Sequence, residues 1–253
     1  GTHTTIASAI TAASSGDTIF IRPGTYTENL ALKAGVNLTS FGTDSDSGTV
    51  TIIGKTTYSS AGTVNIYGIR LQTSSDFFLV VSGNAASIVN LSYCFLNCTN
   101  NTGISFTSSS ASAQINVFDS VGNLVTTGIA YYSSSSAGSM SWEYNQFDNT
   151  GGSSTASTNS AGIVNIFYCS AICCFSNTSA GVAGSIIGSN INTAVLNTTS
   201  FTVGGTAVIS TRFAHFESGT ASAISIGAGT TVHLSNCSVS SSNTNAITGA
   251  GTL

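Results

Sequence analysis

Apolar residues near the start of the chain change from the period of a helix to that of a strand. Between positions 5 and 13 they stand at 6, 9, 10 and 13, which is one face of a short helix. From position 16 the period is two, so Ile19 and Ile21 point to one side of a strand. Phe20 and Arg22 point to the other side. Pro23 and the glycine after it then turn the chain into a second extended run, so the opening predicts a helix, a strand and a tight turn.

A strand-like segment returns at a nearly constant interval along the rest of the chain. The clearest copies cover residues 64–67, 89–92, 115–118, 140–143 and 164–167, and their first residues differ by 25, 26, 25 and 24. The phase continues through Ile186, Val208 and Val232 in steps of 22, 22 and 24. A second strand-like run follows about fifteen residues later in most units, at 103–106, 128–131, 223–226 and 245–248. Internal repetition of this kind indicates a solenoid.

A period near 24 residues with short strands is typical of one rung, meaning one full turn, of a parallel β-helix. Helical solenoids need amphipathic helices, and the sequence shows none in its repeats. The prediction is an all-β, right-handed, single-stranded parallel β-helix of about nine to ten rungs. One domain is expected over 1–253, with an N-terminal capping helix in 1–15 and the rungs in 16–253.

The opening segments also carry a family resemblance. The runs TIASAI at 5–10 and GDTIFIRPGTYTE at 16–28 resemble the opening of the pectin lyase-like superfamily. That superfamily includes pectinesterases, polysaccharide lyases and tailspike or fibre proteins of viruses and phages. The resemblance implies the right-handed β-helix and its capping helix, and beyond about residue 40 only the repeat rhythm matches. It marks a fold that many functions share.

Composition narrows the possible partners. Charged residues make up 6% of the chain and hydrophobic residues 41%, which favours an ordered, nearly uncharged β protein over a disordered one. Five Lys and Arg and a net charge of −4 argue against nucleic-acid binding. The sequence has no apolar run long enough for a membrane span. It starts at Gly1 with no visible signal peptide, so a mature form or a fragment is expected.

The six cysteines are spaced by the repeat. Cys94, Cys169 and Cys237 each stand five residues after the aliphatic residue that opens a unit, which favours buried, unpaired side chains. Cys98 and Cys173 follow two of them by four residues, so a disulfide within a turn is the alternative. No histidine lies near either pair, and we expect no metal and no cofactor.

The acidic residues offer few sets that could catalyse a reaction. Lyases of the pectin lyase-like superfamily combine clustered carboxylates, which bind calcium, with a Lys or Arg base. Pectinesterases of the same superfamily pair two aspartates with Arg and Gln. Related glycosidases need two or three carboxylates on one face. Asp119, Glu143 and Asp148 are the acidic residues expected to approach one face, and no Lys or Arg stands between Arg70 and Arg212. Turn caps and solvated carboxylates are therefore the favoured interpretation, with a polysaccharide hydrolase or lyase as the alternative. Asp44, Asp46 and Asp76 are interpreted as turn residues, although the first two could bind calcium, and His3, His215 and His233 share no ligand spacing.

The repeat phase predicts two outward rows of side chains. Amides and a hydroxyl share one position, at Asn65, Asn90, Asn116, Ser141 and Asn165. Two residues further on stand Tyr67, Ser92, Phe118, Glu143 and Phe167. Stacked amides can form hydrogen bonds with one another along the rod axis. A row of amides beside a row of rings suits a glycan-binding surface, a subunit interface or a second core covered by a loop. Binding to ice or a crystal surface would need threonines in one phase, which the sequence lacks.

These observations predict a non-enzymatic structural or adhesive rod of a surface, fibre or tail-type protein from a virus or bacterium. Its expected location is extracellular, on a cell surface or on a virion. The chain ends in the strand pattern 246–253 without a charged or helical cap, so a further C-terminal domain or another chain is expected to cover that end. Resemblance to tailspikes makes a homotrimer the expected oligomer, with a surface glycan as a further partner.

Overall fold

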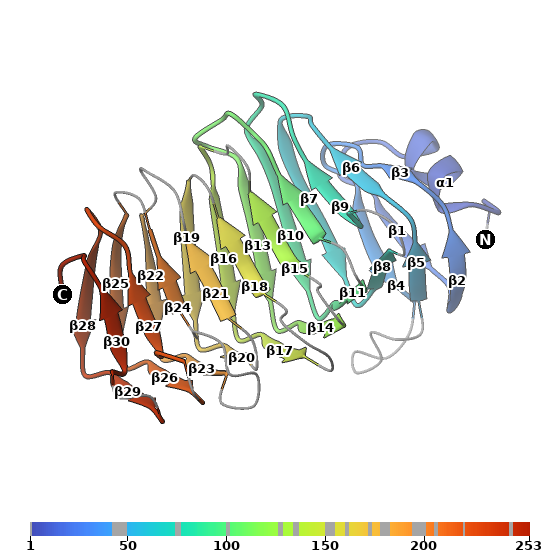
Figure 1. Ribbon diagram of the computed structural model, residues 1–253. Helices are drawn as coiled ribbons and strands as arrows, with labels where there is room; N and C mark the ends of the chain where they lie inside the picture. The colour runs from blue at the N-terminus through green and yellow to red at the C-terminus, as the bar shows by residue number, and fades with distance from the viewer. Residues whose placement is uncertain are drawn as a thin grey trace.

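The molecule is a rod in which strands lie side by side along the long axis (Figure 1). The computed structural model describes residues 2–41, 50–73, 77–99, 102–125, 129–133, 137–149, 155–159, 162–171, 174–177, 183–193, 201–204, 207–219, 221–242 and 245–253. Three sheets run the length of the rod, and each contains ten parallel strands. Successive strands of one sheet are separated in sequence by one strand of each other sheet. This order defines an all-β parallel β-solenoid, which confirms that part of the fold class predicted from the repeats.

The strands of the three sheets have the following bounds. The first sheet contains β1 (Thr18–Ile21), β4 (Asn37–Ser40), β7 (Gly62–Tyr67), β10 (Ser87–Ser92), β13 (Gln114–Phe118), β16 (Ser139–Glu143), β19 (Ile163–Phe167), β22 (Ala183–Ile187), β25 (Val208–Arg212) and β28 (Thr231–Ser235). The second contains β2 (Gly24–Thr27), β5 (Val50–Ile53), β8 (Arg70–Thr73), β11 (Phe95–Thr99), β14 (Val121–Val125), β17 (Gln146–Asn149), β20 (Ser170–Ala171), β23 (Asn190–Thr193), β26 (His215–Ser218) and β29 (Ser238–Ser241). The third contains β3 (Leu30–Ala31), β6 (Thr56–Tyr58), β9 (Leu79–Val81), β12 (Thr102–Phe106), β15 (Ile129–Ser133), β18 (Thr155–Asn159), β21 (Cys174–Asn177), β24 (Phe201–Val203), β27 (Ile224–Ile226) and β30 (Ile247–Gly249).

The register of the first sheet confirms the repeat over its clearest copies and corrects it further on. The first residues of the five clearest copies pair in one column, from Val64 to Val164. That column then passes through Gly184 and Ile209, not through Ile186 and Val208. Val208 is 49% exposed, whereas Ile209 is buried. The phase slips because the unit after Val164 is only 20 residues long, which shifts the apolar pattern that the sequence displays.

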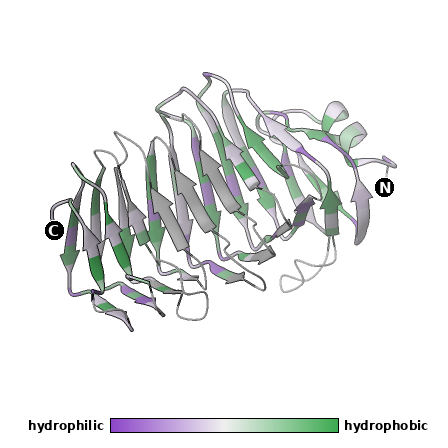
Figure 2. Ribbon diagram, in the orientation of Figure 1, coloured by the Kyte–Doolittle hydropathy of each residue, from purple (hydrophilic) through white to green (hydrophobic). Residues whose placement is uncertain are grey.

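The core is a column of apolar side chains enclosed by the three sheets. Where the structure describes the side chains of a strand, buried residues mostly alternate with outward ones, as in β10, whose Ser87, Val89 and Leu91 are buried. Hydrophobic residues therefore recur along the strands of every sheet (Figure 2). Trp142 and Phe147 are fully buried and meet edge to face at 4.9 Å between ring centroids. Apolar burial of this kind is the main force that holds successive rungs together.

The helix α1 (Ile6–Ala12) is fixed at both ends by side chains from the first rung. Both carboxylate oxygens of Glu28 accept hydrogen bonds, from the backbone N–H groups of Ile6 and Ala7, at 3.0 Å each. At the other end the Lys33 ammonium donates to the carbonyl of Ala13. A carboxylate at the N-terminus and an ammonium at the C-terminus both oppose the helix dipole. A seven-residue helix is too short to be stable alone, so these bonds and the burial of its apolar face hold it in place.

A single residue with left-handed backbone turns the chain from the first sheet to the second in successive rungs. These corner residues have φ between +43° and +66° and are Gly68, Tyr93, Asp119, Tyr144, Tyr168, Gly188, Phe213 and Asn236. The first seven donate their backbone N–H to a carbonyl of the next rung, as Tyr144 does to Phe167 at 3.0 Å. Left-handed backbone costs about 1–2 kcal/mol for a residue with a β-carbon. The repeated hydrogen bond and the packing of successive corners offset that cost.

In five successive rungs the residue after the corner points inward and forms an inner polar ladder, which we define as Cys94, Ser120, Asn145, Cys169 and Ser189. All five are at most 3% exposed. Side-chain oxygens accept the backbone N–H of the rung before them: Ser120 from Cys94 at 3.0 Å, Asn145 from Ser120 at 2.9 Å and Ser189 from Cys169 at 3.1 Å. The Asn145 amide also donates to the carbonyl of Val117 at 2.9 Å. The ladder satisfies backbone groups that the change of sheet leaves without strand partners.

The cysteines of this ladder are free thiols, which contradicts the disulfide alternative for both. Cys94 and Cys169 are buried and unpaired, as the repeat spacing favoured, and Cys237 is free and partly buried. Burial raises the pKa of the Cys94 and Cys169 thiols to about 11, from an ordinary value of 9.0. Cys173 lies outside the described residues. Buried thiols with raised pKa values are poor nucleophiles and serve packing here.

Candidate functional site

An outer amide ladder follows the outward face of the first sheet. The side-chain Nδ2 of Asn65 donates to Oδ1 of Asn37 at 2.8 Å, Asn90 donates to Asn65 at 2.8 Å, and Asn116 donates to Asn90 at 2.9 Å. An amide nitrogen carries two hydrogens, so this bond leaves one donor of each linked amide for other partners. The same column continues in register through Ser141, Asn165 and Ser185. The stacking predicted for Asn65, Asn90 and Asn116 is confirmed, and Asn37 is an additional member.

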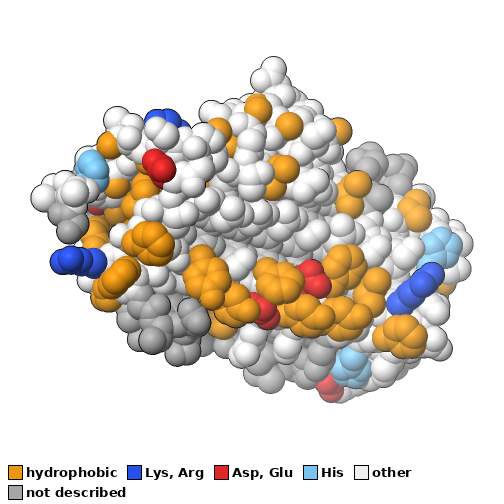
Figure 3. All heavy atoms as spheres, turned by 180° about the vertical axis from the view of Figure 1, so that it is seen from behind, with side chains coloured by type: hydrophobic (Ala, Val, Ile, Leu, Met, Phe, Trp, Pro, Cys, Tyr) orange, Lys and Arg blue, Asp and Glu red, His pale blue; other side chains and the backbone are white. Residues whose placement is uncertain are grey.

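Aromatic side chains gather beside this ladder, where the first sheet meets the second. The outward column two residues further on contains Tyr67, Ser92, Phe118, Glu143 and Phe167, as predicted. The corner residues add rings next to them. We call this set the aromatic ridge: Tyr67, Tyr93, Phe118, Tyr144, Phe167 and Tyr168. Figure 3 shows apolar side chains in a row along the length of this side of the rod.

The rings of the aromatic ridge contact one another and remain open to solvent. Tyr144 and Tyr168 are stacked with centroids 5.2 Å apart and planes 10° apart, whereas Phe118 meets Tyr144 edge to face at 5.6 Å. Tyr67 and Tyr93 form a further pair at 5.1 Å. Phe118, Tyr144 and Tyr168 are 36%, 50% and 53% exposed. These exposures contradict the interpretation that a loop covers the row as a second core.

The middle of the ridge is acidic. Asp119 is a corner residue, Glu143 ends β16, and the backbone N–H of Asp119 donates to the carbonyl of Glu143 at 3.1 Å. The two residues therefore lie on adjacent rungs among the rings. The sequence has no Lys or Arg between Arg70 and Arg212 to neutralise them. Acidic side chains accordingly interrupt the apolar row, with basic side chains toward its ends (Figure 3).

The alternative catalytic set is divided between two sheets. Glu143 belongs to the first sheet, Asp119 to the corner and Asp148 to β17 of the second sheet, where its backbone pairs with Asn123. The structure thus brings Asp119 and Glu143 together but places Asp148 around the corner from them. The possible calcium ligands Asp44 and Asp46, and also Asp76, lie outside the described residues.

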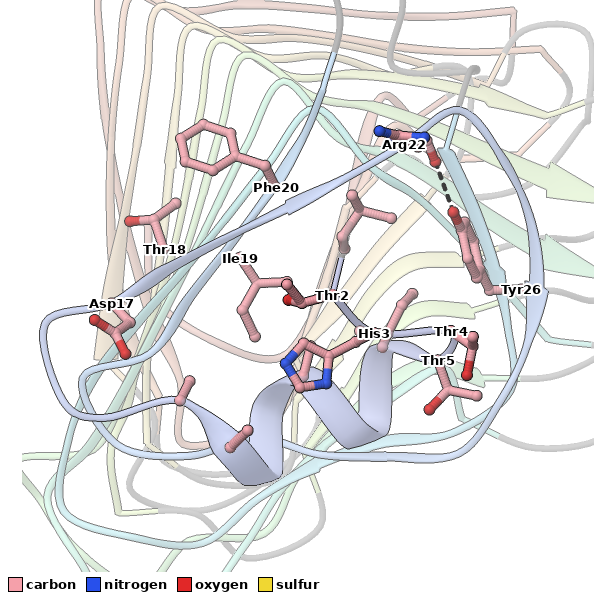
Figure 4. A pocket seen from close by; sticks show the side chains of 15 residues that line it. Thr2, His3, Thr4, Thr5, Asp17, Thr18, Ile19, Phe20, Arg22 and Tyr26 are labelled. Atoms are coloured by element: carbon pink, nitrogen blue, oxygen red, sulfur yellow. Dashed lines mark hydrogen bonds between the residues drawn. The ribbon is translucent and has the colours of Figure 1, made fainter.

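A pocket lies at the N-terminal end, between α1 and β1 (Figure 4). It encloses about 470 Å³, and His3, Asp17, Arg22 and Tyr26 are among its lining residues. The Tyr26 hydroxyl donates to the carbonyl of Arg22 at 2.8 Å, which fixes one wall. None of the residues that the sequence marked as a site lines this pocket.

The other candidate groups remain scattered over the described part of the chain. Within it, no three or more His, Cys, Asp or Glu side chains gather as metal ligands. His215 lies 3.6 Å from Glu217 on the second sheet, away from the ridge. The same described segments contain no helix with the length and hydropathy of a membrane span.

Sequence reasoning found the two outward columns and Asp119 but missed the aromatic corner residues, which supply the most exposed rings of the aromatic ridge. Tyr93, Tyr144 and Tyr168 stand just before Cys94, Asn145 and Cys169 of the inner polar ladder. The recurring pair of a tyrosine and a small buried residue, directly after each strand, is the signal that would have revealed them. The left-handed backbone of the first residue turns its side chain outward while the second points into the core.

The class of protein that the fold and surface define is a parallel β-solenoid with an exposed row of rings and amides. No protein-family model, curated protein or solved structure matches the chain. Of what the resemblance to the pectin lyase-like superfamily implies, the structure shows the parallel β-solenoid.

Proposed function

We propose that the protein is a non-enzymatic structural or adhesive rod of a surface, fibre or tail-type protein, and that it binds a glycan along the first sheet. The observation that carries the proposal is the outer amide ladder running beside the aromatic ridge. Amide groups donate and accept hydrogen bonds with sugar hydroxyls, and ring surfaces cover the apolar faces of sugars. Concave or linear sites for small polar ligands combine apolar walls with a few placed polar groups in the same way.

The finer features of the rod belong to the same proposal. A right-handed coil, α1 as the cap of the N-terminal end, and membership of the pectin lyase-like superfamily follow from the resemblance of the opening segments. An extracellular, cell-surface or virion location suits a chain with few charges and a hydroxyl-rich surface. Self-association, as a homotrimer, or a further C-terminal domain would cover Leu234, Val239 and Ile247, which pack against the core but are only partly buried.

A polysaccharide hydrolase or lyase is the second candidate, because Asp119 and Glu143 lie on adjacent rungs at the ridge. Glycoside hydrolysis needs one carboxyl group to donate a proton while the other attacks the sugar or activates water. A lyase needs a base, and the nearest Lys or Arg residues in the sequence are Arg70 and Arg212. The binding surface requires no such pair, so binding without turnover is the function that we propose.

Removing a central ring is expected to weaken glycan binding about tenfold, because truncation of one well-placed interface ring typically costs this much. Tyr144→Gly is the most informative variant, because glycine already occupies the corner position of two other rungs, at Gly68 and Gly188, with φ of +66° and +60°. The substitution thus removes the ring and the backbone strain together. Binding is measured by titration calorimetry or gel retardation against a panel of soluble neutral, basic and acidic polysaccharides.

Phe95→Ala is the matched control, because this partly buried ring lies on the second sheet under Arg70 and outside the ridge. It should leave glycan affinity unchanged. Equal losses in both variants, or no retention of the parent protein by any polysaccharide, would contradict the proposed function.

A further inference from the structure

We propose that the glycan carries protonated amino groups, and that it lies along the rod with its amines at Asp119 and Glu143. This inference rests on the proposed function and narrows it to one class of ligand, a basic polysaccharide chain. Its neutral sugar units would contact the rings and the outer amide ladder. An acidic polysaccharide, which the resembling pectin-active enzymes use, is the class that this surface disfavours.

The shape of the surface favours a linear ligand over a folded partner. The rings extend from β7 to β19, which are five neighbouring strands, so the ridge is about 20 Å long at roughly 4.8 Å per strand. Its width spans only the outward column and the corner. A strip of this size offers on the order of a few hundred Å², below the roughly 800 Å² per partner that stable protein interfaces bury. A polymer that runs along the axis can use the whole strip.

Symmetry and charge also disfavour a second copy of the chain as the occupant. An isologous contact centred on the ridge would place Asp119 and Glu143 against the same residues of the other copy. No Lys or Arg lies between Arg70 and Arg212 to neutralise such a contact. Like charges at an interface core oppose association, whereas a ligand with amines would pair with both carboxylates.

The rings present both apolar and polar groups to such a chain. Tyr144 and Tyr168 stack on each other, and their side chains are half exposed. Phe118 is turned by 78° from the plane of Tyr144, so the strip contains an edge-to-face pair beside a stacked pair. A tyrosine combines an apolar ring with a hydroxyl tip. Sugar chains alternate apolar C–H patches with polar groups in a comparable way.

Asp119 and Glu143 act within this row as the charged contacts. Both lie between rings, Asp119 directly after Phe118 and Glu143 directly before Tyr144. An exposed carboxylate and an amine at 4 Å attract each other by about 1 kcal/mol in water, and dissolved salt screens this attraction. The preference for a basic chain should therefore be several-fold at low ionic strength and should vanish in concentrated salt.

The test compares two ligands with the same sugar backbone, one with charged amines and one in which acetylation has removed the charge. A chitosan hexamer, with free amines, and its fully N-acetylated counterpart are titrated into the full chain below pH 6, where the amines are protonated. The basic hexamer should bind about fivefold to tenfold more tightly at low salt, and the difference should disappear at about 1 M salt. Polygalacturonate should bind more weakly than either.

Variants separate this inference from the function on which it rests. Asp119→Asn keeps a residue type that tolerates left-handed backbone, and combined with Glu143→Gln it should abolish the difference in affinity between the basic and the acetylated hexamer. Glu217→Gln on the second sheet is the matched charge control and should change nothing. Equal or tighter binding of the acetylated or acidic ligand would overturn the inference but leave the proposed function standing. Absence of binding to all three ligands would overturn both the inference and the proposed function. A dimer in light scattering that Tyr144→Gly dissociates would also overturn both, because the ridge would then be a protein interface.

Discussion

Replacing Asn145 with alanine is expected to lower the free energy of unfolding by about 3–5 kcal/mol, because its amide satisfies two backbone groups and leaves a cavity when removed. The side chain is 3% exposed. Its oxygen accepts the N–H of Ser120 at 2.9 Å, and its nitrogen donates to the carbonyl of Val117 at 2.9 Å. Both groups belong to the preceding rung, so the substitution weakens the joint between rungs rather than one strand.

Denaturant unfolding of two further variants makes this prediction specific. Asn145→Ser should recover part of the loss, since Ser120 and Ser189 accept the equivalent N–H groups of the preceding rungs at 3.0 Å and 3.1 Å. Asn116→Ala removes an outer amide bond of 2.9 Å at the surface and should cost about 1 kcal/mol or less. Equal losses for the inner and outer asparagines would show that the inner polar ladder has no special role.

Alkaline conditions are expected to destabilise the rod through its two buried ladder thiols. Burial raises the pKa of Cys94 and Cys169 to about 11 from 9.0, so the unfolded chain loses these protons at lower pH than the folded protein does. The stabilising contribution is therefore complete below about pH 9 and is lost as the pH rises to about 11. Each thiol accounts for about 2–3 kcal/mol, since one pKa unit corresponds to about 1.4 kcal/mol.

The measurement is the free energy of unfolding as a function of pH for the parent protein and for Cys94→Ala combined with Cys169→Ala. Other groups titrate in the same range, so the informative quantity is the difference between the two curves. That difference should be constant between pH 6 and 8 and should shrink by several kcal/mol between pH 9 and 11. A constant difference over the whole range would mean that the thiols are not buried as the inner polar ladder requires.

The solenoid could be predicted because its core imposes a strict period on the sequence. Val64, Val89 and Ile115 occupy one inward column, so equal rung lengths become equal spacings of aliphatic residues. The outward asparagines were visible for the same reason. The prediction failed where one rung is shorter. The unit after Val164 has 20 residues, so the inward column continues through Ile209 and not through Val208.

Apart from its first strand, β2, the second sheet was not predicted from the sequence, and this failure has a physical cause. From β8 onward, each of its strands follows the first sheet after two residues, the corner residue and the inward residue after it, with no run of turn residues to mark the boundary. At Tyr93, Tyr144 and Tyr168 the left-handed position holds an aromatic residue, which is rare there because its β-carbon opposes that backbone. The rings stack on neighbouring rungs, so the packing that offsets the strain exists only once the solenoid has formed.

The same corners explain why the candidate site was found only in part. Alternation along a strand locates Tyr67 and Phe118, but a corner residue belongs to no alternation. The direction of a corner side chain depends on the left-handed φ of that residue. A sequence indicates such a φ only where glycine or asparagine occupies the position. The ridge is therefore wider and more exposed than the outward column that the repeat predicts.

The most direct test of the proposed function measures binding and turnover in one sample. The protein is incubated with the polysaccharide that it retains best, and the bound fraction and the number of new reducing ends are followed together. Hydrolysis and lyase cleavage both create a reducing end at each broken bond, whereas binding creates none. We expect saturable binding with no increase in reducing ends, and a steady increase that is lost in Asp119→Asn or Glu143→Gln would contradict the account.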